Sequence, residues 1–231
     1  MTIGFSTGDL YAKSSFEIKK GLENLKKIGS TAVEIGVWGG MDSPSLDKII
    51  KNNFDGFEYI SLHAPGGPYK KDDRTRKFLN KLEEVNSEIR LDQIIFHPNE
   101  IEDMAVFDDY SLPIAIENMD WRKDFGRTVK DLNEFFKGNS FGFVLDLNHV
   151  FTVDKTLNEV NNFYKEFKNR IKEIHLSGIK EIHDPLYLTK QEEIIKAIPD
   201  KNIPIIIESF RSPYLELAKA KKELNYILER V

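Results

Sequence analysis

Cysteine is absent from the 231-residue sequence. Disulfide bonds, thiolate metal ligands and cysteine nucleophiles are therefore excluded. The sequence also lacks any apolar run near the roughly 18 residues that a membrane-spanning helix needs. Its first residues, MTIGFSTG, show no basic segment followed by a long apolar stretch, so they do not resemble a signal peptide. We therefore expect a soluble, cytoplasmic protein with no membrane partner.

An excess of basic residues is likewise missing. The 33 Lys and Arg residues face 38 Asp and Glu residues, which gives a net charge of −5. This balance argues against nonspecific attraction to nucleic acid or to an anionic membrane, although a local basic patch remains compatible with it. No linker or low-complexity run divides the chain, so we expect one domain over residues 1–231.

Eight short runs rich in Ile, Val and Phe are spaced along the chain. They are continuous apolar stretches without strict alternation, which is typical of strands covered on both faces. The expected strands occupy residues 2–6, 32–38, 58–63, 92–97, 113–118, 141–147, 172–177 and 203–209.

Segments with helical periodicity separate most of these runs. Residues 14–29 begin with the capping-box pair Ser14 and Glu17 and end at Gly29. Further helices are expected over residues 156–170 and 213–231, whereas residues 100–111 allow at most a short helix.

This alternation of strands and helices predicts parallel strands, and eight such units predict an α/β fold of one compact (β/α)₈ TIM barrel. The alternative is a doubly wound open sheet. The segment GFSTGD after the first run is not the GxGxxG pattern that many such sheets carry.

Six consecutive expected strands carry His, Asp or Glu at or near their ends. These residues are His63, His97, Glu117, Asp146, His175 and Glu208. In a TIM barrel these strand ends converge on the face that holds the active site. Each histidine alone could be a hydrogen-bonded core residue, but three imidazoles and three carboxylates in one ring need a shared partner. A divalent cation is the simplest one, and ligands without thiolate suit zinc, manganese or iron better than calcium.

Three further residues could approach the same face from its rim. His149 follows Asp146 by three positions and has left the strand. Glu181 and His183 are two apart and would project to the same side of an extended segment. Asp184 competes with Glu181 for that role.

The motifs SLHAP, FHPN, IEN, LDLNH and IHLSG each stand at the end of the corresponding strand. With them, nearly the whole chain resembles the xylose isomerase-like TIM barrels. That superfamily includes nucleases of the endonuclease IV type (AP endonuclease family 2) and sugar isomerases and epimerases.

The resemblance to the nuclease branch implies nine ligands for three zinc ions. His63 and His97 would bind a first ion, and Glu117 would bridge it to a second. Asp146, His175 and Glu208 would complete the second site. The third ion would be held by His149, Glu181 and His183. The chain departs from the family at Glu181, where an aspartate is usual.

The resemblance to the isomerase and epimerase branch implies a single metal ion. Its ligands would be Glu117, Asp146, His175 and Glu208. His149 would touch the substrate, while Glu117 and Glu208 would move protons between adjacent carbons. The arginine that this branch often carries soon after the strand-seven histidine is missing from HLSGIKEIH. His63, His97 and His183 would then have no metal role.

A multinuclear site suits phosphoester hydrolysis because two cations about 3.5–4 Å apart activate water and neutralise the leaving oxygen together. We therefore expect a metal-dependent hydrolase of phosphate esters, with damaged DNA as one candidate substrate. It would use two or three Zn²⁺ ions, or Mn²⁺, and its expected catalytic residues are Glu117, Glu208 and His149. A sugar or sugar-phosphate isomerase or epimerase is the alternative, and a non-catalytic ligand-binding barrel is a third hypothesis.

Two basic loops could contact DNA, or could instead be solvated helix starts and packed aromatics. One carries Tyr69, Lys70, Lys71, Arg74, Arg76 and Lys77, and the other carries Trp121, Arg122, Lys123 and Arg127. Inside the second strand, Glu34 could orient a metal-bound histidine or could be a paired core charge. Trp38, at the top of that strand, could form a wall of the pocket.

Overall fold

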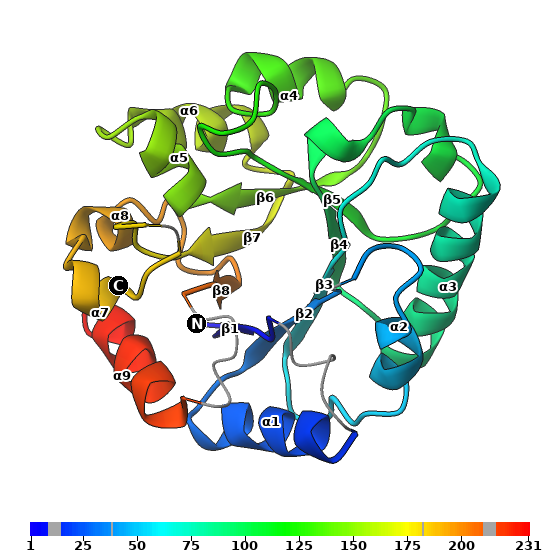
Figure 1. The fold of residues 1–231 in the computed structure, drawn as a ribbon. Coiled ribbons are helices and arrows are strands. Elements are labelled where there is room, and N and C mark those ends of the chain that lie inside the picture. Colours follow the sequence, from blue (N-terminus) through cyan, green and yellow to red (C-terminus); the bar gives the residue numbers. More distant parts are fainter. Residues whose placement is uncertain (9–14, 38, 182, 210–215) are drawn as a thin grey trace.

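The computed structural model describes residues 1–8, 15–37, 39–181, 183–209 and 216–231. Its strands are parallel and close into a barrel in chain order, because β1 pairs with both β2 and β8 (Figure 1). The strands are β1 (Ile3–Ser6), β2 (Ala32–Gly36), β3 (Tyr59–His63), β4 (Gln93–Phe96), β5 (Ile114–Glu117), β6 (Gly142–Asp146), β7 (Ile171–Leu176) and β8 (Ile205–Ile207). The predicted TIM barrel is therefore confirmed, and the open sheet is wrong.

Helices surround the barrel as an outer ring (Figure 1). They are α1 (Ser15–Lys27), α2 (Ser45–Ile49), α3 (Asp73–Ile89), α4 (Val129–Phe135), α5 (Leu147–Val153), α6 (Asn158–Phe167), α7 (Leu186–Thr189), α8 (Glu192–Lys196) and α9 (Leu217–Leu228). Between β4 and β5 lie the 3₁₀ segments η2 (Pro98–Glu100) and η3 (Met104–Phe107), as the weak periodicity there predicts. Among the described residues, no helix is long and apolar enough to cross a membrane.

The amphipathic stripes explain how the helices dock. Val160, Phe163 and Phe167 lie on one face of α6 and are buried, as expected from their spacing. On α1, Ile18, Leu22 and Leu25 are buried in the same way. The predicted cap Ser14, the pocket residue Trp38 and the helix start at Pro213 lie outside the described residues.

The interior of the barrel is unusually polar near its carboxyl end. Successive strand side chains alternate between faces, so Ala115 and Val144 point inward like Glu117 and Asp146 two positions later. Together with Ile95 they form a small apolar cluster of their own, apart from the main core. Branched aliphatic side chains normally fill such interiors. Here Glu34, Ser61, Glu173 and His175 are also fully buried.

Candidate metal centre

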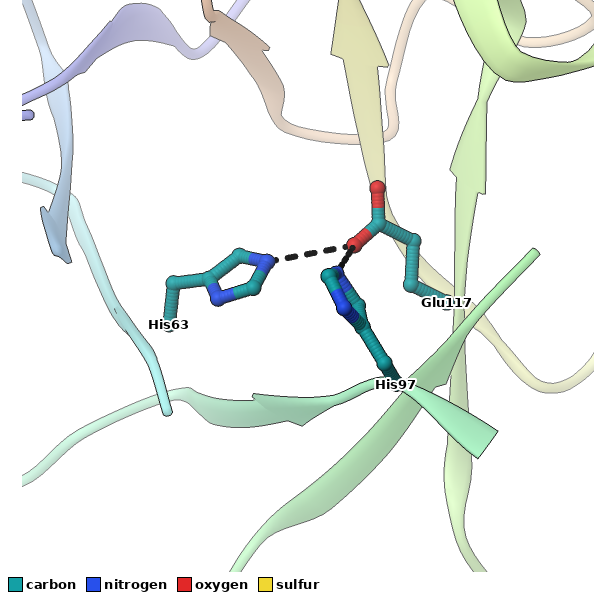
Figure 2. A group of neighbouring side chains, drawn as sticks. All are labelled: His63, His97 and Glu117. Carbon is teal, nitrogen blue, oxygen red and sulfur yellow. Dashed lines mark hydrogen bonds and ion pairs between the residues drawn. The ribbon is translucent and has the colours of Figure 1, made fainter. Parts of the chain in front are cut away.

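Three neighbouring strands build the first ligand group. His63 ends β3, His97 directly follows β4, and Glu117 ends β5. Both imidazole Nε2 atoms face one carboxylate oxygen, because Oε2 of Glu117 lies 3.2 Å from His63 and 3.0 Å from His97 (Figure 2). The three residues thus offer ligand atoms within 4.8 Å of one another, as a shared cation requires.

A second group lies on the other side of the same glutamate. Oε1 of Glu117 lies 3.2 Å from Nδ1 of His175, and that nitrogen lies 3.4 Å from Oε2 of Glu208. Asp146, at the end of β6, completes this set within the same 4.8 Å limit. Glu117 therefore belongs to both groups and turns one oxygen toward each.

Asp146 shows that the second group fits a cation. Its Oδ1 accepts a hydrogen bond from the amide of His149 at 2.8 Å and so caps α5. Its Oδ2 is buried and has no hydrogen-bond partner among the described residues. A buried carboxylate oxygen without a partner is costly, and a bound divalent metal would satisfy it. Imidazole and carboxylate donors without thiolate are the set that zinc and manganese accept.

Shifted pKa values reflect the same concentration of charge. Burial disfavours the imidazolium of His63, but the hydrogen bond to Glu117 and the charge of Glu34 outweigh it and raise the pKa to about 10. Burial raises the pKa of Asp146 to about 7. Burial also opposes ionisation of Glu208, yet the charge of His175 and its hydrogen bond lower the pKa to about 2. The centre therefore favours bound positive charge.

The expected third group is only partly assembled. The rings of His149 and His183 lie 5.6 Å apart between centroids, and Glu181 lines the same cavity. Among the described residues, these three do not offer ligand atoms within 4.8 Å of one another. Nδ1 of His149 lies 2.8 Å from the carbonyl oxygen of Asn118, so this nitrogen carries a proton, and Nε2 lies 3.9 Å from Oδ2 of Asp120.

Glu181 and Asp184 differ in their hydrogen bonds. Oδ2 of Asp184 accepts the backbone N–H groups of Lys180 and Glu181, each at 2.7 Å. Asp184 therefore holds the loop that follows β7. Glu181 is exposed, and both residues line the cavity.

A cavity of about 950 Å³ lies at the carboxyl end of the barrel, and its lining includes His63, His97, Glu117 and Glu208. Glu34 lies at its base, and Arg122 and Lys123 line its β5 side. The Arg122 guanidinium is paired with Asp120. The cavity lining therefore combines basic side chains with the carboxylates and imidazoles of the candidate ligand groups.

The two basic loops differ in what they offer to a partner. Tyr69 is fully buried and packs edge-on against Phe96, so it cannot stack on a base or sugar. Arg74 is paired with Asp42 at 2.8 Å, and Arg76 is paired with Asp73 at 2.8 Å. Trp121, in the loop after β5, is 62% exposed.

Sequence reasoning missed two carboxylates that support the histidines. Oε1 of Glu100 lies 3.6 Å from Nδ1 of His97, the nitrogen that faces away from Glu117. Oε1 of Glu173 lies 2.9 Å from Nε2 of His175. The second could have been found from the alternation of β7, because residues two apart in a strand point to the same face.

No family model and no curated protein sequence matches the chain. Solved structures with the same fold include endonuclease IV from Thermus thermophilus, with a TM-score of 0.71, 16% identity and 100% of both chains covered. A D-allulose 3-epimerase from Methylomonas sp. gives 0.65 and 15%, covering 100% of this chain and 98% of the epimerase. An L-ribulose 3-epimerase gives 0.64 and 14%, covering 97% and 92%. The resemblance to the xylose isomerase-like TIM barrels is thus confirmed at the level of the fold.

Proposed function

Because the chain has the fold of the xylose isomerase-like TIM barrels, we propose that it is a divalent-metal-dependent enzyme that hydrolyses phosphate esters or phosphodiesters. One observation carries the proposal, namely the position of Glu117 between two ligand groups. Its Oε2 faces His63 and His97, and its Oε1 faces His175. A carboxylate that turns one oxygen to each side is suited to bridge two cations.

The ligands of the first ion would be His63, His97 and Glu117, and those of the second would be Glu117, Asp146, His175 and Glu208. When bound, such ions supply a hydroxide nucleophile near neutral pH and positive charge beside the leaving oxygen. His149, Glu181 and His183 would hold a third ion. Zn²⁺ is the proposed metal, and Mn²⁺ accepts the same ligands.

Side chains of the cavity would present a metal ligand, attract the substrate or keep a ligand charged. Nε2 of His149 would be the atom offered to the third ion, because its Nδ1 is hydrogen-bonded to the carbonyl oxygen of Asn118. Lys123 adds positive charge to the wall, where an anionic phosphate ester would be attracted. Glu208 would keep its ligand oxygen ionised because the charge of His175 lowers its pKa. A small sugar phosphate and a strand of damaged DNA share this phosphoester chemistry.

One observation favours sugar isomerisation or epimerisation as a second candidate. Glu117 and Glu208 come from β5 and the end of β8, and both approach the same nitrogen of His175, at 3.2 and 3.4 Å. Two carboxylates on either side of one metal position could remove and return a proton at adjacent carbons. This function would need only the second ligand group.

The deciding experiment combines metal analysis with an activity panel. The purified protein is loaded with Zn²⁺ or Mn²⁺ and incubated with a duplex carrying an abasic site, bis(p-nitrophenyl) phosphate, and several ketoses and aldoses. We expect at least two ions per chain and hydrolysis of a phosphodiester. One ion at saturation together with conversion of a sugar would contradict the proposal in favour of the isomerase. A protein that binds no metal and turns over none of these substrates would instead be a non-catalytic barrel.

A further inference from the structure

Both ring nitrogens of His175 are engaged, on opposite sides of a fully buried ring. Nδ1 faces the proposed metal position, at 3.2 Å from Glu117 and 3.4 Å from Glu208. Nε2 points into the barrel interior, where Oε1 of Glu173 lies at 2.9 Å and Oε2 of Glu34 at 3.1 Å. Two carboxylates therefore compete for the single proton that a neutral imidazole carries.

Glu173 is held in place from the opposite wall of the barrel. Strand β3 lies across from β7, with three strands between them on either side. From β3, the hydroxyl of Tyr59 donates to Oε2 of Glu173 at 3.0 Å, and the hydroxyl of Ser61 donates to Oε1 at 3.2 Å. With the N–H of His175 this carboxylate receives three donors in a buried environment. Such hydrogen bonds stabilise the ionised acceptor and fix its orientation.

Glu34 lacks this support. It is fully buried, and within the described part of the chain neither of its carboxylate oxygens has a hydrogen-bond partner. Its contact with Nε2 of His175, at 3.1 Å, is a charge contact without hydrogen-bond geometry. The Nε2 proton of His175 therefore has one well-oriented acceptor, which is Glu173.

We propose that Glu173, oriented by Tyr59 and Ser61, is a positioning residue that keeps the proton of His175 on Nε2 and so presents the Nδ1 lone pair to the metal. This role rests on the proposed metal site and extends that site across the barrel interior to Tyr59 and Ser61 on β3. A carboxylate that accepts the second N–H of a ligating histidine fixes its tautomer and raises its basicity. Glu34, Glu173 and His175 also offer ligand atoms within 4.8 Å of one another, but His175 is absent from the group of His63, His97 and Glu117. The effect of Glu173 should therefore fall on one ion and leave the ion of His63 and His97 in place.

The test compares Glu173→Gln with the matched variant Glu34→Gln. Zinc affinity is measured by competition with a chromophoric chelator, and the thermal midpoint is recorded with and without zinc. We expect E173Q to bind one ion about 10- to 100-fold more weakly while keeping the other, and E34Q to change much less. A purely structural defect would lower the thermal midpoint equally with and without zinc. Loss of positioning would instead reduce the rise in thermal midpoint that zinc produces. Long-range ¹⁵N NMR of the zinc-loaded wild type should place the His175 proton on Nε2.

If E173Q does not fold, Tyr59→Phe removes one donor to the carboxylate without changing the side-chain skeleton, and we expect it to weaken the same ion by a smaller factor. If the wild type binds zinc and E173Q or Y59F binds it equally well, Glu173 is not a positioning residue. That result would overturn the inference but would not contradict the proposed function. Equal loss of one ion in E34Q and E173Q would point to a cation held between the two carboxylates and would also overturn it. A wild type that binds no metal would remove both proposals.

Discussion

Asn118 and Asp146 join the ends of β5 and β6 by a reciprocal pair of hydrogen bonds. The amide N–H of Asp146 donates to Oδ1 of Asn118 at 2.8 Å, and Nδ2 of Asn118 donates to the carbonyl oxygen of Asp146 at 3.0 Å. Both residues are buried. The pair fixes the spacing between Glu117, which directly precedes Asn118, and Asp146, so two ligands of the second group are placed by one side-chain amide.

The Asn118→Ala variant should therefore lose both stability and metal affinity. It leaves the buried N–H of Asp146 without its partner and removes one hydrogen bond to the carbonyl oxygen of Asp146, which should lower the free energy of unfolding by about 1–3 kcal/mol. Urea unfolding of the metal-free protein measures this change. Asn139→Ala is the control, because Asn139 makes its hydrogen bonds in the loop before β6, at the other end of the strand. N139A should also unfold more easily but bind zinc like the wild type. Equal zinc affinity in N118A and N139A would contradict the positioning role.

Glu117→Gln should release metal at two positions. A glutamine cannot bridge two cations with two anionic oxygens, so we expect fewer bound ions and a loss of turnover greater than about 100-fold. Elemental analysis and the activity panel measure these changes, and circular dichroism checks that the fold remains intact. Glu84→Gln, which changes an exposed carboxylate paired with Lys81, is the control. Wild-type activity in E117Q would rule out a bridging role.

His97→Ala separates the two candidate functions. In the multinuclear hydrolase His97 binds the first ion, so the variant should lose one ion and more than about 100-fold of its activity, since even indirect supports of a metal are worth about 10- to 100-fold. In a one-metal isomerase the ligands are Glu117, Asp146, His175 and Glu208, and His97 has no metal role. Sugar conversion that survives in H97A, at an unchanged metal content, would favour the isomerase.

The metal-free protein should become less stable as the pH rises. The folded-state pKa of His63 is raised from 6.5 to about 10, and that of Asp146 from 3.8 to about 7. A group whose pKa is higher in the folded chain stabilises the fold below its unfolded pKa, and that contribution is lost as the pH rises through the folded value. The losses therefore fall between pH 3.8 and about 7 for Asp146 and between pH 6.5 and about 10 for His63.

Metal should reverse this trend, because the ligands must be deprotonated to bind it. Thermal midpoints are measured at about pH 6 and about pH 9, once with excess chelator and once with excess zinc. They test how the stability of the metal-free protein changes with pH and how the gain from zinc changes with pH. We expect the midpoint to fall with pH in chelator and the gain from zinc to be larger at the higher pH. A chelated protein with a higher midpoint at pH 9 than at pH 6 would contradict the charge arrangement of the centre.

Much of the fold was predictable because barrel units are local. Each unit consists of a short apolar run followed by a segment that is amphipathic or helix-capped, and both patterns lie within about thirty consecutive residues. The stripe of Val160, Phe163 and Phe167 and the weak unit at residues 100–111 both appear as expected. The prediction of strand-end ligands followed from the same rule, since parallel strands bring their carboxyl ends to one face.

Local patterns could not show which side chains share an oxygen or a proton. Tyr69 is buried because it packs against Phe96, which is far from Tyr69 in sequence. Tyr69 therefore does not belong to the exposed surface of the basic loop. The role of Asp184 depended on two backbone amides of its own loop. The alternation of β7 places Glu173 on the face of His175, but its hydrogen bonds to Tyr59 and Ser61 depend on the opposite wall of the barrel.

The sequence by itself determined the order of the strands, the helices that cover them and the set of imidazoles and carboxylates at one end, because periodicity and strand direction are properties of short segments. Only the tertiary structure decided that Glu117 turns its two oxygens toward different histidines and that His175 is held between two acidic groups. Those relationships depend on the curvature of a closed sheet, which brings residues more than a hundred positions apart to within hydrogen-bond distance.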